Sequence, residues 1–319
     1  MRLNRFGIIL GFGMLLTLAL FKTNGDAQAN SMSEVVKGVW FREGDLSQGH
    51  CNNTVIEMKD GLVVIDANFP SGARAVMADV KKVSQKPVKY VFDTHHHGDH
   101  AYGNAVWTKA GAITLAYQGV ADEMKRYEPS RWKETDRQDV KELNLATAEP
   151  PHQTFTKTPF ILEDETRRIE FHFFGWAHTR GDGFAWLPKD KVLATGDAAT
   201  NGPYNFMADG NIGNWPKVIA AAQKLNAVHV LPGHGPRGGA EILKGQKLFF
   251  EDILKNVSAE LKKGKKLEEV VTFVDKKPKS TTVAVSDGAR QWMGGDFAGQ
   301  VALAYRELSE KKPAGDLPH

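Results

Sequence analysis

One hexapeptide restricts the folding and chemistry of this chain more than any other segment: His95-His96-His97-Gly98-Asp99-His100. Its four imidazoles and one carboxylate are close enough in sequence for a single loop to wrap them around metal. Neutral imidazole and carboxylate are ligands that suit divalent zinc, iron and manganese. The segment therefore predicts a metal-binding loop.

Residues of the same ligand types recur further along the chain. His178, Asp197 and His234 each lie in a glycine-rich turn. Together with the hexapeptide, they supply enough ligands for two adjacent metal ions. Two metals without a substrate-sized cofactor indicate chemistry with metal-activated water.

The hydrophobic pattern around the hexapeptide predicts an α/β fold. Two β-rich runs flank the Asp60-Gly61 turn and predict a hairpin over 53–66. The strand expected over 88–93 runs directly into the histidine loop. The neighbouring segments predict a helix over 71–85, a helix over 104–109 and a strand over 112–115. This alternation is typical of a layered α/β protein.

The second half of the chain predicts a similar order of elements. Strands are expected over 155–188, and a hairpin across Lys189-Asp190 pairs 183–188 with 191–197. A helix over 215–225 and a strand over 228–231 follow. Two similar halves that face each other would place all the candidate ligands at one edge.

Three further segments are predicted to be helical. The charged segment 116–144 is expected to cover the core and to be broken near Pro129. Long amphipathic helices are expected over 242–271 and 297–311. We therefore predict one domain over 30–319, with a catalytic core over about 38–240 and a helical C-terminal extension over about 241–319.

The first 29 residues have the features of a cleaved export signal. Arg2 and Arg5 precede an apolar run over 7–21, and Ala27-Gln28-Ala29 fits the small-x-small cleavage rule. The alternative is a permanent membrane anchor, but a run of about 15 residues is short for a span of roughly 20. We expect a secreted or periplasmic protein without a stable membrane anchor after processing.

Composition restricts the remaining function classes. Hydrophobic residues make up 41% of the chain and charged residues 25%, which is ordinary for a globular protein with a core. A formal net charge of +3 gives no indication of nucleic-acid binding. Cys51 is the single cysteine, so an internal disulfide is excluded. A small-molecule substrate is expected, and a homodimer is left open.

The spacing of the candidate ligands resembles that of the metallo-β-lactamase superfamily, whose signature is His-x-His-x-Asp-His on a loop after a strand. Three later motifs of that family are matched in order, and the likeness extends over roughly residues 38–240. They are Gly175-Trp-Ala-His178-Thr-Arg-Gly181, Thr195-Gly196-Asp197 and Pro232-Gly233-His234-Gly235. The resemblance implies a four-layer αβ/βα sandwich, followed here by the helical extension.

The resemblance also implies roles for the seven ligands. One metal would be held by His95, His97 and His178, and the other by Asp99, His100 and His234, while Asp197 bridges the two. It implies a dinuclear zinc hydrolase, with two Zn²⁺ per chain, in which a metal-bridging hydroxide attacks an acyl carbonyl. Asp99 would be the catalytic residue that orients the hydroxide and accepts its proton. Iron or manganese is the alternative metal.

Further residues are expected around this centre. Asp66 and Thr179 are expected to hydrogen-bond to metal ligands. His96 is expected to face away from the metals, either towards solvent or towards a ligand. Tyr204 and Asn205 are expected to line the substrate pocket, because they follow Asp197 on a Gly-Pro-Tyr-Asn loop. An arginine at 180 or 237 could pair with a substrate carboxylate.

The substrate is left open among esters, thioesters, lactones and β-lactams. Aspartate at 197, where similar exported β-lactamases use cysteine or serine, favours the thioesterase, lactonase and phosphodiesterase branches. The chain is also similar to exported hydrolases of sulfur-oxidation and quinoprotein-dependent systems. Three alternatives remain: a β-lactamase proper, an iron-dependent oxidoreductase acting on persulfides or dioxygen, and a metal-binding protein without turnover.

Overall fold

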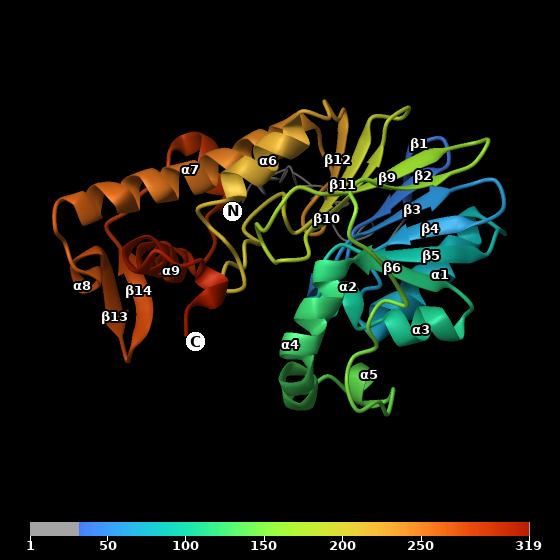
Figure 1. Cartoon of the computed structure of the whole chain (residues 1–319), viewed down its shortest axis with the longest axis horizontal. Coiled ribbons are helices and arrows are strands. Elements are labelled where there is room, and N and C mark those ends of the chain that lie inside the picture. The colour runs from blue at the N-terminus through green and yellow to red at the C-terminus, as the bar shows by residue number, and fades with distance from the viewer. Residues whose placement is uncertain (1–31, 319) are drawn as a thin grey trace, which may run out of the picture.

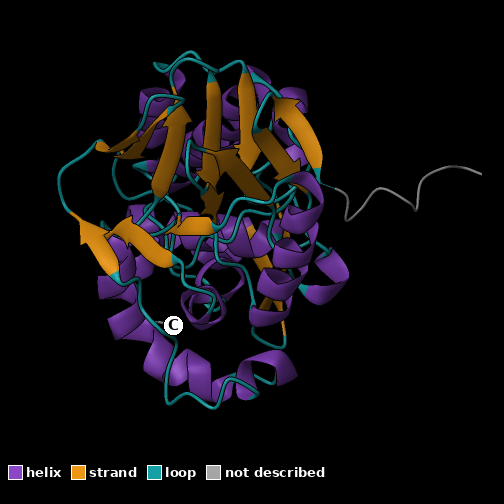
Figure 2. Ribbon diagram, turned by 90° about the vertical axis from the view of Figure 1, so that its right-hand side faces the viewer, coloured by secondary structure: helices purple, strands orange, loops and turns teal. Residues whose placement is uncertain are grey.

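The computed structural model describes residues 32–318. The predicted export signal lies outside the described residues. Within residues 32–318, no helix is both long and apolar enough to cross a membrane. Most of the strands gather in one half of the molecule, and helices lie around them (Figure 2).

The larger sheet carries the histidine loop. Its seven strands are paired in chain order: β1 (Ser33–Val36), β2 (Val39–Arg42), β3 (Asn53–Glu57), β4 (Leu62–Ile65), β5 (Val88–Asp93), β6 (Ile113–Tyr117) and β7 (Gln153–Phe155). Strands β3 and β4 form the predicted hairpin, with Val55 opposite Val64. From β4 to β7 the pairing is parallel, as expected where helices connect the strands.

The smaller sheet supplies the remaining candidate ligands. Its five strands lie in the order β12 (His229–Pro232), β11 (Val192–Gly196), β10 (Gly183–Leu187), β9 (Arg168–Phe173) and β8 (Phe160–Glu163). Strands β10 and β11 form the predicted antiparallel hairpin. Strand β12 pairs parallel with β11 after the connecting helix α6 (Trp215–Gln223).

Helices cover the outer face of each sheet. The larger sheet is covered by α1 (Pro70–Val83), whose Val76 and Val80 pack on Val55 and Val91, and by α3 (Asn104–Lys109). The smaller sheet is covered by α6 and α7 (Ala240–Lys262). Between the sheets, the rings of Phe92 and Phe171 lie 4.3 Å apart in a shared core. The result is the expected four-layer sandwich (Figure 1).

The C-terminal extension, residues 240–318, lies beside the smaller sheet, on the far side of the molecule from β1–β5 (Figure 1). It contains α7, α8 (Leu267–Val270), β13 (Val271–Val274), β14 (Lys277–Thr281), the 3₁₀ turns η2 (Asp287–Trp292) and η3 (Ala314–Asp316), and α9 (Phe297–Glu310). The prediction of one helix over 242–271 is wrong. The helix ends at Lys262, and Gly264 has a φ of +75° that a continuing helix does not allow. The β13–β14 hairpin was not predicted.

The predicted break near Pro129 is also wrong. Helix α4 (Gln118–Glu134) continues through this proline, and the short helix α5 (Gln138–Lys141) follows after a gap. A proline removes one intrahelical hydrogen bond to the carbonyl four residues earlier. The affected carbonyl here is that of Lys125. Pro129 and Lys125 are both exposed, so this carbonyl lies on the solvent side of the helix.

Candidate metal centre

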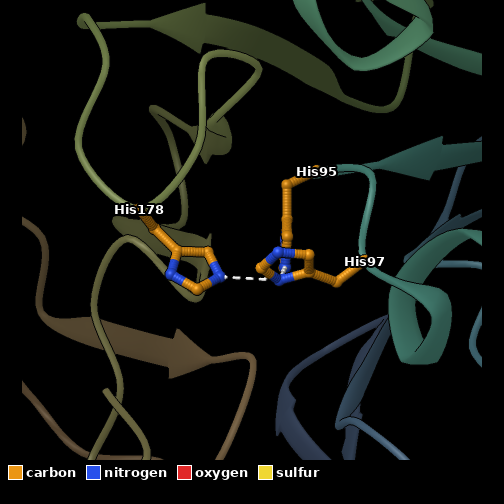
Figure 3. Close-up of side chains that lie close together, drawn as sticks. All are labelled: His95, His97 and His178. Atoms are coloured by element: carbon orange, nitrogen blue, oxygen red, sulfur yellow. Dashed lines mark hydrogen bonds between the residues drawn. The ribbon is translucent and has the colours of Figure 1, made fainter. Parts of the chain in front are cut away.

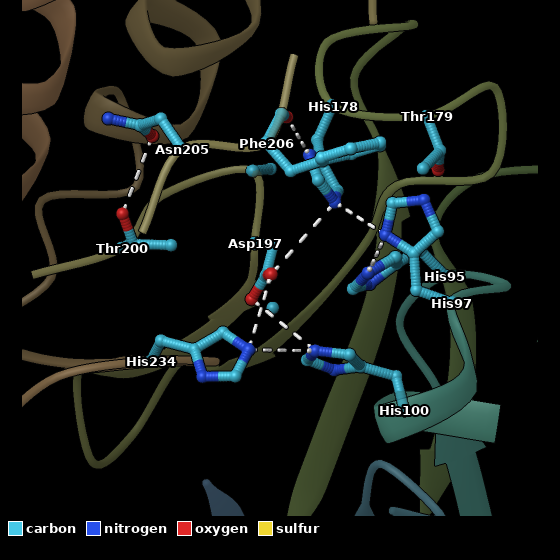
Figure 4. A network of polar contacts seen from close by, with 12 residues as sticks. His95, His97, His100, His178, Thr179, Asp197, Thr200, Asn205, Phe206 and His234 are labelled. Atoms are coloured by element: carbon cyan, nitrogen blue, oxygen red, sulfur yellow. Dashed lines mark hydrogen bonds and ion pairs between the residues drawn. The ribbon is translucent and has the colours of Figure 1, made fainter. Parts of the chain in front are cut away.

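The candidate ligands meet where strands of both sheets end. His95 to His97 follow the last residue of β5, and the short helix α2 (Gly98–Ala101) begins directly after them. The hexapeptide is therefore half loop and half helical turn. Asp197 follows β11 and His234 follows β12, and His178 precedes β10. Two separate sheets thus deliver all seven predicted ligands to one place. Figure 4 shows the histidine ligands and Asp197.

Three imidazoles form the first cluster (Figure 3). The Nδ1 atom of His97 lies 3.1 Å from Nε2 of His95 and 2.9 Å from Nε2 of His178. Nitrogens that bind one zinc tetrahedrally at about 2.0–2.1 Å would lie roughly 3.4 Å apart. The cluster is therefore close to the size that a single cation requires.

The outer nitrogens of these three imidazoles have polar partners of their own. Nδ1 of His178 lies 2.9 Å from the carbonyl oxygen of Phe206, and Nε2 of His97 lies 2.8 Å from Asp209. Nδ1 of His95 lies 3.1 Å from the hydroxyl of Thr94. A ring nitrogen that donates outward leaves the other nitrogen as a lone pair, so these contacts orient the lone pairs towards one another.

The second cluster contains Asp99, His100 and His234. Nε2 of His234 lies 3.0 Å from a carboxylate oxygen of Asp99 and 3.4 Å from Nε2 of His100. On its other side, Nδ1 of His100 lies 2.9 Å from Asp66. Asp66 also accepts the backbone N–H of Thr94, so it holds both His100 and the start of the histidine loop.

Asp197 lies between the two clusters. Its Oδ1 atom lies 3.5 Å from Nε2 of His100. Its Oδ2 atom lies 3.5 Å from Nε2 of His234 and 3.9 Å from Nε2 of His178. The Oδ1 atom is buried and accepts no hydrogen bond. A buried carboxylate oxygen without a partner is costly unless a cation binds it, so this atom fits a bridging ligand.

A glycine makes this approach possible. A Cβ atom added to Gly233 would lie 2.1 Å from Oδ1 of Asp197. Any larger residue at this position would displace the carboxylate. The glycine before His234 therefore has a steric role in the centre.

The charges around the clusters favour cation binding. Burial lowers the pKa of His178 to about 3, and burial together with the neighbouring imidazoles holds the pKa of His95 well below its usual range. Burial opposes ionisation of Asp197, but His234, His100 and His178 outweigh it and lower its pKa to about 2. Near neutral pH, His95 and His178 therefore offer neutral imidazoles and Asp197 offers a carboxylate.

We expect the metal-free protein to be most stable near pH 6.5. His96 and His178 have folded-state pKa values of about 3, so between pH 6.5 and that value the unfolded chain binds protons that the folded chain excludes. Their contribution falls on acidification by roughly 1.4 kcal/mol per pH unit for each histidine. His100 and His234 have the opposite dependence: their contribution to the free energy of unfolding decreases as the pH rises above 6.5. Burial opposes their protonation, but nearby negative groups, including Asp99 and Asp197, outweigh it and raise both pKa values.

Urea unfolding of zinc-free protein from about pH 5 to about pH 8 measures this dependence. Unperturbed carboxylates titrate below this range, but buried Asp182, whose pKa burial raises to about 7, titrates within it and partly offsets the histidine contribution. A free energy of unfolding that stays constant across it would contradict the expectation.

Thr179 and Asn205, two of the predicted site residues, do not make the contacts that were predicted for them. Thr179 makes no hydrogen bond to a metal-ligand side chain. Its hydroxyl donates to Asp182, which also accepts the backbone N–H groups of Ala177, His178 and Thr179. It therefore shapes the turn that carries His178.

The side chain of Asn205 is buried and lies 3.4 Å from the hydroxyl of Thr200, away from the imidazoles (Figure 4). It does not line the pocket.

His96 is fully buried, so the solvent-facing alternative is wrong, and its Nε2 lies 3.6 Å from Asp209, the carboxylate that also contacts His97. The ring of His96 stacks on Tyr127 with centroids 5.5 Å apart.

The two arginines predicted to pair with a substrate carboxylate instead contact other groups of this chain. Arg180 pairs with Glu123 and Asp316, and Arg237 donates to the carbonyl of Glu34.

Sequence reasoning missed Asp209 and Arg131. Asp209 is fully buried, accepts from Nε2 of His97 and pairs with the guanidinium of Arg131 through both oxygens. Burial opposes its ionisation, but hydrogen bonds from His96 and His97 and the charge of Arg131 keep its pKa well below the usual range. No local pattern around position 209 could have revealed this role.

If the clusters bind metal, substituting Asp209 with asparagine is expected to weaken that binding by roughly 10- to 100-fold, with zinc as the test ion. The amide keeps the shape of the side chain but removes the charge that strengthens His97 as a ligand. Competition titration with a chromogenic chelator measures the zinc dissociation constant. Asp190→Asn, which alters the distant pair with Arg167, is the matched control. Equal zinc affinity of the two variants would contradict the role of Asp209.

An open pocket of about 390 Å³ lies over the clusters. Its floor contains His97, Asp99, Asp197 and His234. Its walls include Leu46, Arg131, Tyr204 and Phe206, so the pocket joins apolar surface to one guanidinium. The prediction that Tyr204 lies at the pocket agrees with this geometry.

Comparisons with known proteins agree with the fold. Metallo-beta-lactamase IND-1 of Chryseobacterium indologenes is 26% identical over 200 residues, which cover 60% of this chain and 74% of that protein. A metallo-beta-lactamase from Pontibacter korlensis has a similar structure, with a TM-score of 0.59, 20% identity and coverage of 70% of this chain and 99% of the other. One from Hirschia baltica has a TM-score of 0.54, 21% identity and coverage of 68% and 95%.

The structural neighbours, at such low identity, establish the fold alone. The family assignment rests on the sequence model of the metallo-beta-lactamase superfamily, which matches residues 46–247. That match spans more than half of the chain and includes all seven candidate ligands. The chain therefore belongs to the metallo-beta-lactamase superfamily.

Proposed function

We propose that this protein is a dinuclear zinc hydrolase of an acyl compound: an ester, a thioester, a lactone or a β-lactam. The observation that carries the proposal is the arrangement of two three-ligand clusters around the carboxylate of Asp197, whose buried Oδ1 accepts no hydrogen bond, at the floor of an open pocket. The donor set of imidazoles and carboxylates suits zinc, and iron and manganese remain alternatives.

His95, His97 and His178 would hold one cation, and Asp99, His100 and His234 the other. Bound zinc would supply a Lewis acid for the substrate carbonyl and would lower the pKa of a water molecule towards neutrality. Asp197, which lies near both clusters, would fix the separation of the cations. These assignments account for the closest contacts among the seven side chains.

Asp99 is the residue best placed to handle the proton of the attacking water. Its carboxylate lies at the pocket floor and is partly exposed, whereas Asp197 is almost fully buried. Burial opposes ionisation of Asp99, but His100 and His234 outweigh it and hold its pKa well below the usual range. An ionised carboxylate in contact with the pocket can orient a water molecule and accept its proton.

The pocket supports an acyl substrate with an apolar part. The exposed side chains of Leu46 and Phe206 are 56% and 51% accessible, and both lie at the pocket walls. Exposed apolar side chains beside a polar centre are typical of sites that bind a mixed apolar and polar ligand. Aspartate at 197 favours esters, thioesters and lactones, and the named relatives keep β-lactams among the candidates.

Elemental analysis and a substrate panel test the proposal together. Protein expressed in medium balanced in zinc, iron and manganese is analysed for metal and then assayed with chromogenic ester, thioester, lactone, β-lactam and phosphodiester substrates. We expect two zinc ions per chain, as in two-metal hydrolytic centres, and turnover of at least one acyl substrate that a chelator abolishes. One iron per chain with oxygen uptake, or full metal loading without turnover on any substrate, would contradict it.

We also propose that the protein is exported, because the first 29 residues carry the features of a cleaved signal. Mass spectrometry of protein from the cell envelope fraction tests this. A mature N-terminus at Asn30 is expected. An intact Met1 N-terminus in the cytosolic fraction would contradict it.

A further inference from the structure

The C-terminal extension holds the loop that forms one wall of the pocket. We call residues 200–209 the pocket loop. Three elements of the extension donate hydrogen bonds to it: Trp292 in η2 donates to the carbonyl of Thr200 at 2.8 Å, Gln246 in α7 to Oδ1 of Asn205 at 2.6 Å, and Gln300 in α9 to the carbonyl of Asn205 at 2.7 Å. The loop is thus tied to the extension at its first residue, Thr200, and at its middle, Asn205.

These contacts lie in the interior of the protein. Gln246 is fully buried, and Gln300, Trp292 and Asn205 are each at least nine-tenths buried. A buried carbonyl that loses its donor cannot turn to water without moving the backbone. The position of the pocket loop therefore depends on these side chains, and two of them, Trp292 and Gln300, lie beyond the family match, which ends at 247.

The residues on either side of Asn205 contact the candidate metal centre. The carbonyl of Phe206 accepts from Nδ1 of His178, and the ring of Phe206 lies 5.4 Å from that of His97. The ring of Tyr204 lies 5.6 Å from that of His234. A shift of Asn205 would therefore move the carbonyl of Phe206, a hydrogen-bond partner of one cluster (Figure 4). It would also move the ring of Tyr204, a packing partner of the other cluster.

We propose that Gln246 and Gln300 are positioning residues of the active centre, and that the C-terminal extension sets the geometry of the pocket through Asn205. The two glutamines contact neither ligand nor pocket. They act through the pocket loop on the orientation of His178 and on the wall formed by Tyr204 and Phe206. The effect on turnover rests on the proposed hydrolase function, whereas the effect on the loop does not.

Gln300→Met tests the proposal, because methionine has a similar length and shape but no amide donor. Tyr305→Phe is the matched control: Tyr305 lies on the same helix, and its hydroxyl donates to the carbonyl of Lys265, far from the pocket loop in sequence. Hydrogen–deuterium exchange of peptides over 200–209 is measured in both variants. Zinc affinity and kcat and KM on a substrate found in the panel are measured in parallel.

We expect Gln300→Met to raise exchange in the pocket loop, to weaken zinc binding by roughly 10-fold and to raise KM, whereas Tyr305→Phe changes none of these. Gln246→Met, which removes the donor to the side chain of Asn205, should act in the same direction. It replaces Gln300→Met in the test if that variant does not fold. Identical loop exchange in the glutamine variant and Tyr305→Phe would overturn the proposal. Absent turnover with increased loop exchange would contradict the hydrolase assignment and leave the coupling of extension and loop supported.

Discussion

Replacing Asp99 with alanine is expected to reduce kcat/KM by roughly 10²- to 10⁴-fold while the protein stays folded. The carboxylate contributes to the second cluster through its contact with His234 and also faces the pocket. Its removal takes away both a ligand and the group best placed to accept a proton from water. Steady-state kinetics on the best substrate of the panel, at saturating zinc, measure the loss.

Asp122→Ala is the control for this experiment. Asp122 is an exposed aspartate on α4 whose carboxylate accepts only from Gln118 among the described residues. We expect wild-type kinetics for this control and similar melting temperatures for all three proteins. Turnover of Asp99→Ala at the wild-type rate would refute the role of Asp99.

Replacing Asp197 with asparagine is expected to remove one of the two zinc ions and to lower turnover at least about 10²-fold. Two divalent cations at roughly 3.5–4 Å repel each other strongly, and the carboxylate between them offsets this repulsion. An amide has nearly the same size but no charge, so it cannot do so. Equilibrium dialysis followed by elemental analysis gives the number of zinc ions per chain.

The matched comparison is Asp182→Asn, since Asp182 is also buried and lies close to the centre in sequence and space. Its carboxylate binds the backbone of the turn at His178, and burial raises its pKa to about 7. This variant should destabilise the fold without removing the bridge. Retention of two zinc ions by Asp197→Asn would contradict the bridging assignment.

The sequence predicted the candidate metal ligands better than it predicted the residues that hydrogen-bond to them. The ligands lie in loops, or in the short helix α2, close to the ends of strands, so the strand pattern and the ligand spacing reinforced each other for residues such as His95 and Asp197. Asp66 could be anticipated because it directly follows β4, the strand adjacent to β5. Asp209 and Arg131 could not, because their pairing joins a loop after β11 to helix α4 and depends on tertiary packing alone.

The prediction for Asn205 was wrong for a related reason. Consecutive residues of a loop point in different directions, so Tyr204 and Phe206 line the pocket while Asn205 between them turns towards the extension. The position of the extension was not deducible from its sequence. The helix expected over 242–271 was overextended, because apolar residues of α8 and β13 continue the helical spacing beyond the turn at Gly264.

Anomalous diffraction at the zinc absorption edge, from crystals of zinc-loaded protein, tests the dinuclear centre most directly. We predict two peaks about 3.5–4 Å apart. One should lie among His95, His97 and His178 and the other among Asp99, His100 and His234, with Asp197 in contact with both. A single peak, or peaks away from these side chains, would contradict the dinuclear centre and with it the proposed hydrolase.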